Sequence, residues 1–144
     1  MIPIGTIAVG TDGSDTAGKA VTMAFELAER YGAKLVLLSA FGGSGGGSAP
    51  RLSPHEYPEW KSNAAEHVDR ILAIAEESAA ARGIEATSAM AEGDPGEVLV
   101  SLAERHGADV IVVGSKGMER RVLGSVPNTV THKAPCSVLV VKTS

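Results

Sequence analysis

Apolar residues follow two alternating patterns along this chain: short continuous runs, and longer stretches in which they recur every three or four positions. The continuous runs are rich in Val, Ile and Leu and predict buried strands at residues 6–10, 35–40, 109–113 and 137–141. A weaker, more polar run at 84–91 predicts an edge strand. The stretches between these runs have helical spacing, so we expect strand and helix to alternate throughout.

Capping residues mark where the helices begin and end. Ser14 or Asp15 can cap the first helix, and Gly32 stands where a C-terminal glycine cap belongs. Asp94-Pro95 predicts the start of another helix, because proline fits the first helical position. Ser125 is expected to open a short final helix.

This alternation predicts an α/β fold in a single domain over residues 1–144. Strands joined by helices require right-handed crossovers, so the sheet is expected to be open and mostly parallel. In such sheets ligands bind beyond the carboxyl ends of the strands. Residues 10–15, the segment from Ala40 and the segment from Gly114 all follow strands at that edge, and we expect them to form one binding site.

Composition narrows the functional class. Hydrophobic residues make up 44% of the 144 residues and the formal net charge is −4, so no basic field for nucleic acid is expected. The one cysteine, Cys136, excludes an intrachain disulfide and fits a reducing compartment. The sequence has no secretory pattern at its start and no apolar run near the roughly 20 residues of a membrane span. It therefore predicts a cytoplasmic protein without a nucleic-acid or membrane partner.

Glycines follow the continuous run at 109–113 and precede the final helix. Gly114, Gly117 and Gly124-Ser125-Val126 would expose backbone N–H groups at a helix N-terminus, a surface that binds phosphates. Glycines needed only for turn geometry are the alternative reading. Three cations flank this loop in an otherwise acidic protein: Lys116, Arg120 and Arg121. They either neutralise phosphates or belong to an ordinary solvated loop.

Asp12 lies just beyond the first strand. With Gly13 it suits a tight turn, but Ser14 or Asp15 is the better helix cap, which leaves Asp12 without an expected structural role. A carboxylate at this edge can accept hydrogen bonds from ribose hydroxyls or from an adenine amino group. We therefore expect Asp12 to contact a nucleoside.

No residue set is typical of an efficient enzyme. Residues 13–20 have the spacing of a phosphate-binding P-loop, but Ala20 replaces the Ser or Thr that holds Mg²⁺, and helical periodicity begins near Ala17. The four histidines are scattered, and no pair has metal-ligand spacing on one helix face. We expect no catalytic residue and no metal site.

Three segments resemble the universal stress protein family, and the likeness covers nearly the whole chain: Val9 to Ser14, Val112 to Val126 and Ala134 to Val141. The ATP-binding branch of that family carries G-x2-G-x9-G-[ST]. Gly114-x2-Gly117 and Gly124-Ser125 fit this pattern, but the spacer from Met118 to Leu123 is six residues rather than nine.

The resemblance implies an open five-stranded parallel sheet in the order 3-2-1-4-5 with helices on both faces, Rossmann-like and similar to the adenine nucleotide alpha hydrolases. The residues that it implies for ribose and adenine are Thr11, Asp12 and the backbone at Ala40. Those that it implies for the rest of the ribose and the phosphates are Gly114, Gly117, Gly124, Ser125 and Val126.

The function that these observations predict is that of a small cytoplasmic universal stress protein. It would bind an adenine nucleotide, ATP first, with or without Mg²⁺, and act in stress response or signalling. Three alternatives stay open: cyclic AMP binding in the same pocket, a protein-interaction module without nucleotide, and slow Mg²⁺-dependent hydrolysis of ATP. By resemblance the protein is also expected to form a homodimer through its last strand, Val138 to Val141.

Overall fold

The structure is a computed structural model that describes residues 3–42, 57–115 and 124–143, with side chains from residue 63 onward in the second range. The strands are β1 (Thr6–Gly10), β2 (Lys34–Gly42), β3 (Ala86–Gly93), β4 (Val110–Gly114) and β5 (Ser137–Val141). The helices are α1 (Asp15–Tyr31), α2 (Tyr57–Ala81), α3 (Pro95–Arg105) and α4 (Ser125–Lys133). Strand and helix alternate along the chain, as the hydrophobic pattern predicts.

All strand pairs are parallel, and their order across the sheet is β3-β2-β1-β4-β5. This confirms the order that the resemblance implies. β1 is central, because Ile7 pairs with Leu35 of β2 on one side and with Val110 of β4 on the other. The more polar β3 lies at an edge, as its composition predicts.

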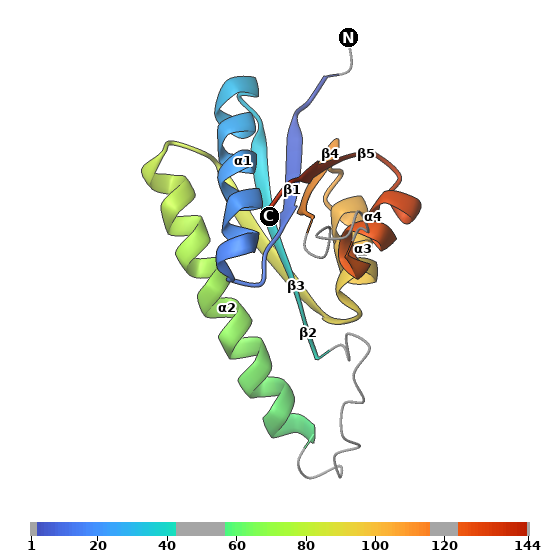
Figure 1. Ribbon diagram of the computed structural model, residues 1–144. Helices are drawn as coiled ribbons and strands as arrows, with labels where there is room; N and C mark the ends of the chain where they lie inside the picture. The colour runs from blue at the N-terminus through green and yellow to red at the C-terminus, as the bar shows by residue number, and fades with distance from the viewer. Residues whose placement is uncertain (1–2, 43–56, 116–123, 144) are drawn as a thin grey trace.

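The helices form a layer on each face of the sheet (Figure 1), α1 and α2 on one face and α3 and α4 on the other. Side chains alternate along the strands, so Ile7 and Val9 join the core beneath α1 and α2, whereas Ala8 joins the core beneath α3 and α4. Both faces are covered, which explains why the central strands are continuous apolar runs.

Side-chain and glycine caps define the helix ends. Ser14 caps α1, with its Oγ accepting a hydrogen bond from the N–H of Ala17, and Asp94 caps α3 by accepting from the N–H of Glu97. Gly32 ends α1 in the left-handed conformation at φ 63°. These three caps are the ones that the sequence predicts, with Ser14 rather than Asp15 at the first helix.

Several strand ends differ from the prediction by one or two residues: β3 spans Ala86–Gly93 where 84–91 was predicted, and β4 spans Val110–Gly114 where 109–113 was predicted. β2 continues to Gly42, because Ala40–Gly42 pairs with residues 91–93 of β3. These two strands extend together beyond the end of β1. α3 ends at Arg105 with His106 as its cap, and Gly107 follows in the left-handed conformation at φ 66°, which confirms the sequence prediction that this glycine stops the helix. None of the differences moves the carboxyl edge, where β1 ends at Gly10 and β4 at Gly114.

Strand order reverses between β1 and β4. The chain leaves β1 toward β2 on one side of it, and later returns to place β4 on the other side. The helices that follow β1 and β4, α1 and α4, therefore lie on opposite faces of the sheet, and open α/β sheets hold ligands at such a point. The fold thus positions a site between Gly10 and Gly114.

Candidate functional site

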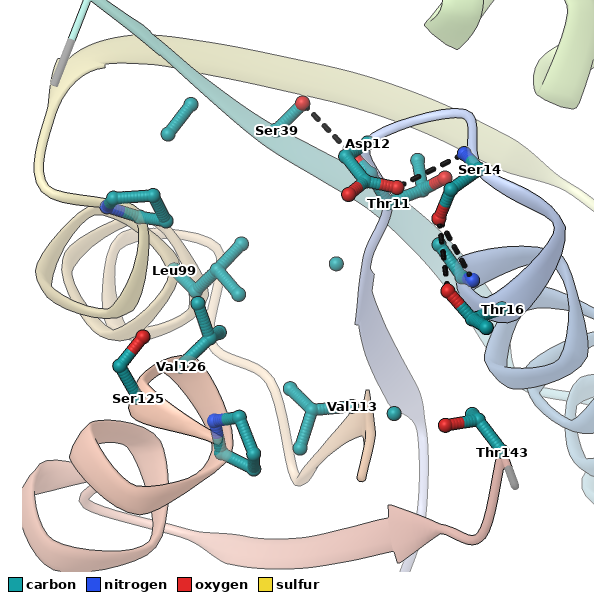
Figure 2. A pocket seen from close by; sticks show the side chains of 16 residues that line it. Thr11, Asp12, Ser14, Thr16, Ser39, Leu99, Val113, Ser125, Val126 and Thr143 are labelled. Carbon is teal, nitrogen blue, oxygen red and sulfur yellow. Dashed lines mark hydrogen bonds between the residues drawn. The ribbon is translucent and has the colours of Figure 1, made fainter. Parts of the chain in front are cut away.

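A cavity of about 390 Å³ opens at this carboxyl edge (Figure 2). It is bounded by the ends of β1, β2 and β4 and by the first turns of α1, α3 and α4. Thr143, two residues beyond the end of β5, completes the boundary. The lining residues are Gly10, Thr11, Asp12, Ser14, Thr16, Ala17, Ser39, Ala40, Pro95, Leu99, Val113, Gly114, Ser125, Val126, Pro127 and Thr143.

The cavity has a polar wall and an apolar wall. Figure 2 shows Thr11, Asp12, Ser14 and Thr16 together at the start of α1, across the cavity from Leu99 and Val126. Asp12 is the single charged residue among the described lining residues. A ligand that suits both walls has an apolar, flat part and a part rich in hydroxyl or other polar groups.

Two hydrogen bonds between residues two positions apart build the Asp12 loop. Asp12 Oδ1 accepts from the N–H of Ser14 at 2.9 Å, and Thr11 Oγ1 accepts from the N–H of Gly13 at 3.1 Å. Asp12 therefore does have a structural role as an Asx turn, and the expectation that it has none is wrong. The reason is geometric: a helix cap at Ser14 and an Asx turn at Asp12 use different N–H groups.

A hydrogen bond from Ser39 connects β2 to this loop. The Ser39 side chain is buried, and its Oγ donates to the carbonyl oxygen of Thr11 at 2.7 Å. The N–H of Thr11 in turn donates to the carbonyl oxygen of Leu38 at 2.9 Å. The backbone of Thr11 is thus held at both its N–H and its carbonyl group.

Gly10 lets the apolar wall approach the sheet closely. A Cβ at this position would lie 2.6 Å from Cδ1 of Leu99, far inside van der Waals contact. Because Gly10 has no side chain, Leu99 of α3 packs directly over the end of β1 and forms the floor of the cavity. The same glycine therefore serves packing and pocket shape together.

α4 begins differently from α1 and α3. Its N-cap is Gly124, with φ −61° and ψ 168°, and no side-chain cap hydrogen bond is formed there. The first N–H groups of the helix belong to Ser125 and Val126, since Pro127 has none, and all three residues line the cavity. This end carries the positive pole of the helix dipole and can accept an anion.

The structure brings together most of the residues predicted for the site. Thr11, Asp12, Ala40, Gly114, Ser125 and Val126 all line the cavity. Gly124 is the N-cap immediately before the lining residues of α4. The predictions for Gly117 and for the cations Lys116, Arg120 and Arg121 lie outside the described residues.

Several lining residues were missed because their position depends on contacts distant in sequence. Leu99 lies in a stretch whose helical spacing predicts only a core-facing helix, and Ser39 lies in a run predicted only as a buried strand. Thr143 follows β5 and carries no local motif. A polar residue within an apolar strand, as Ser39 is, offers the one signal that could have been used.

The remaining chemistry-bearing residues do not form a second site. Gly18 and Lys19 lie within α1, which confirms that the P-loop spacing there is not a phosphate loop. His67, His106 and His132 are exposed, and the described residues contain no group of three or more His, Cys, Asp or Glu side chains able to hold a metal. Burial, followed by the charge of Asp109, raises the pKa of the Cys136 thiol.

Nothing in the described helices is both long enough and apolar enough to cross a membrane.

Comparison with known proteins identifies relatives over nearly the whole chain. The model of the universal stress protein family matches residues 3–142. The universal stress protein Rv1636 of Mycobacterium tuberculosis is 35% identical over 147 residues, which cover 96% of this chain and 97% of that protein. The universal stress protein YxiE of Bacillus subtilis is 31% identical over 142 residues, with 93% and 96% covered.

Solved structures agree with the sequence relatives. A universal stress protein crystallised in complex with cAMP is 33% identical, with a TM-score of 0.74 over 99% of this chain and 100% of that one. The structure of the protein MJ0577 is 25% identical, with a TM-score of 0.84 over 99% of each chain. By sequence over nearly its full length and by fold, this chain belongs to the universal stress protein family.

Proposed function

We propose that the protein binds an adenine nucleotide, ATP first, in the cavity at the carboxyl edge of the sheet. The observation that carries this proposal is the arrangement of the cavity walls. An apolar wall from Leu99 and Val126 faces hydroxyl and carboxylate groups at the start of α1, and α4 adds a helix N-terminus without a side-chain cap. A flat base, a ribose and a phosphate match these three surfaces in turn.

Each predicted site residue has a role in this proposal. Thr11, Asp12 and the backbone at Ala40 contact the ribose and the adenine. The ribose and phosphates contact Gly114, Gly117, Gly124, Ser125 and Val126. The glycines suit this role because a ligand can approach backbone N–H groups closely where no side chain intervenes.

Cyclic AMP is the second candidate ligand for the same cavity. A universal stress protein 33% identical to this chain has been crystallised with cAMP. A cyclic nucleotide carries one phosphate with a single negative charge, and so it demands fewer N–H donors than a triphosphate. The described lining residues include no cation, which suits a ligand of low charge.

The biological role that follows is nucleotide-dependent signalling in the cytoplasm under stress, through binding rather than efficient catalysis. We infer that the nucleotide acts as a ligand whose occupancy changes the surface around the cavity. Mg²⁺ accompanies the nucleotide only if ATP, rather than a monophosphate, is the ligand bound.

We also propose that the protein forms a homodimer through β5. This strand is at an edge of the sheet, and Val138, Leu139 and Val140 are only half-buried against the chain itself. An apolar edge strand exposes unpaired backbone groups, which an antiparallel copy of the same strand would satisfy.

Calorimetric titration with ATP, ADP, AMP and cyclic AMP tests the binding proposal, with Asp12→Asn as the diagnostic variant. Asn can still accept the hydrogen bond from Ser14, so the loop is retained while the negative charge is lost. Since hydrogen bonds to charged groups exceed neutral ones by about 1 kcal/mol, we expect the variant to bind the preferred nucleotide roughly five- to tenfold more weakly.

Asp15→Asn is the matched control, because Asp15 is exposed in the first turn of α1 and does not line the cavity. It should bind like the parent. If none of the four nucleotides binds more tightly than about 1 mM, a level that corresponds to about −4 kcal/mol, the proposal is wrong. Equal affinity of Asp12→Asn and the parent would show that the nucleoside does not contact Asp12.

A further inference from the structure

The chain does not leave the sheet at the end of β5 but continues into the wall of the cavity. Thr143 is 5% exposed and lines the cavity beside Gly114. Its backbone N–H donates to Oγ of Ser115 at 3.0 Å, and the N–H of Ser115 donates to the carbonyl oxygen of Val141 at 2.8 Å. These bonds prolong the pairing of β4 with β5 beyond the strand ends.

Lys19 holds the same residue from the opposite side. Its Nζ donates to the carbonyl oxygen of Thr143 at 3.1 Å, across 124 positions of sequence. Lys19 itself does not line the cavity. The backbone of Thr143 is therefore fastened at both its N–H and its carbonyl group, which fixes where its side chain can lie.

Gly114 leaves the room that this side chain occupies. A Cβ at Gly114 would lie 3.0 Å from Cγ2 of Thr143, closer than nearly all side-chain contacts allow. In Figure 2 the Thr143 side chain points from the C-terminal segment toward the end of β4 next to Val113. The Thr143 hydroxyl is 3.4 Å from Oγ of Ser115, a long contact that leaves it capacity for a second partner.

We propose that Thr143 is a ligand-contacting residue of this cavity, whose hydroxyl bonds a hydroxyl group of the nucleoside, and that Lys19 is its positioning residue. The proposal rests on the proposed function, because it assumes a nucleoside in the cavity. A threonine hydroxyl both donates and accepts, so it matches a ribose hydroxyl, which also does both. It adds a contact from beyond Val141, where the last segment of the family resemblance ends.

Two variants test the two roles. Thr143→Val keeps the shape of the side chain and removes the hydroxyl. Lys19→Met keeps most of the length of the side chain and removes the amine that holds the Thr143 carbonyl oxygen. Their matched controls are Thr22→Val on the exposed side of α1 and Lys142→Met, an exposed lysine next to Thr143; neither control residue lines the cavity.

Adenosine and AMP are the ligands for calorimetry, since adenosine has no phosphate. We expect Thr143→Val to weaken the binding of adenosine and of AMP by the same factor, about five- to tenfold, which corresponds to the loss of one hydrogen bond in a desolvated site. We expect Lys19→Met to weaken adenosine as well, while Lys19→Arg, which retains a donor, binds like the parent. Melting temperatures of all variants show whether folding has changed.

Hydrogen exchange at the Thr143 amide supplies a readout that overall stability does not move. Ligand should slow this exchange in the parent, and the slowing should be smaller in Lys19→Met, because binding and docking of this segment are reciprocally linked. Exchange at the Ala24 amide, in the buried middle of α1, serves as the internal reference.

The outcomes separate this inference from the function on which it rests. A parent that binds neither adenosine nor any adenine nucleotide overturns both. A parent that binds, with Thr143→Val of equal affinity, overturns the contact while the function stands. If Lys19→Met weakens AMP but not adenosine, Lys19 contacts the phosphate directly and its positioning role is wrong.

Discussion

At the scale of single residues, the loop between β1 and α1 is held from outside by α2. Gly13 has φ 81°, a conformation that glycine adopts without strain. A Cβ there would lie 2.9 Å from Cδ1 of Ile71 and 3.0 Å from its Cγ1, so this side chain packs over the Gly13 backbone. The loop that carries Asp12 is thus hydrogen-bonded to β2 through Thr11 and packed against α2 through Gly13.

Removal of this contact should loosen the loop. We expect Ile71→Ala to lower the free energy of unfolding by about 1–3 kcal/mol, less than for a fully buried isoleucine, and to weaken nucleotide binding as well. Ile74→Ala on the same helix is the control, because Ile74 is 66% exposed and its truncation should stay within about 0.5 kcal/mol. Chemical denaturation and calorimetry measure the two effects; equal binding by Ile71→Ala would show that the loop needs no support from α2.

Local sequence chemistry predicts some site residues and not others. Asp12 was predicted as a contact residue because its position after a strand and before a helix is visible in the sequence. Its hydrogen bond to Ser14 was not predicted, because the sequence alone does not show that the turn at Asp12 and the helix cap at Ser14 use different N–H groups. Thr143 depends on Lys19 and Ser115, and no pattern within a few residues reports such distant partners.

At the scale of elements, α1, α3 and α4 all direct their N-termini toward the cavity. They differ in whether a side chain caps the free backbone N–H groups at that end. α1 and α3 carry side-chain caps from Ser14 and Asp94, whereas α4 starts at Gly124 without one. α3 and α4 also pack closely, because a Cβ on Gly96 would lie 2.6 Å from Cβ of Thr129. α3 therefore fixes the position of α4 and of its uncapped end.

A charge placed at the start of α4 tests whether a phosphate binds there. Gly124 has the extended conformation of an N-cap, so Asp and Asn both fit and both can cap the helix. A carboxylate about 4 Å from a phosphate costs on the order of 1–4 kcal/mol, so Gly124→Asp should weaken ATP binding by at least roughly fivefold and adenosine binding far less. Gly124→Asn adds the cap without the charge and should weaken ATP much less; an unchanged ATP affinity in Gly124→Asp would place the phosphates elsewhere.

Element positions were largely predictable because hydrophobic runs and caps are local signals. β1 and β5 begin and end where the runs predict, and Asp94-Pro95 opens α3. The ends that differ are set by pairing: β2 reaches Gly42 only because β3 runs beside it to Gly93. Such an extension follows from the neighbouring strand and not from the composition of β2.

At the scale of the whole molecule, strand order decides where the cavity lies and which strand is left at an edge. The hydrophobic pattern predicted parallel strands joined by helices but no order, which came from the family resemblance and is confirmed. That order puts β1 in the centre and β5 at an edge, with half-buried valines along it.

The proposed dimer predicts a mass of twice 14.7 kDa in solution, measured by light scattering on a sizing column. Val140→Lys should shift the protein toward the monomer mass, because antiparallel pairing of two copies would bring the new charges near one another and desolvate them. Thr87→Lys on the other edge strand, β3, is the control and should keep the parent mass. A parent that already runs at 14.7 kDa over a range of concentrations would rule out a stable dimer.

The C-terminal wall of the cavity also bears on how the protein is made. The Asp12 loop is among the first segments to leave the ribosome, whereas Thr143 and Ser115 meet only after β5 has emerged. A nascent chain can therefore assemble the polar wall early, yet its cavity stays open on one side until translation has passed residue 143. Nucleotide affinity would then be lower in a chain that stops before Thr143 than in one that includes it.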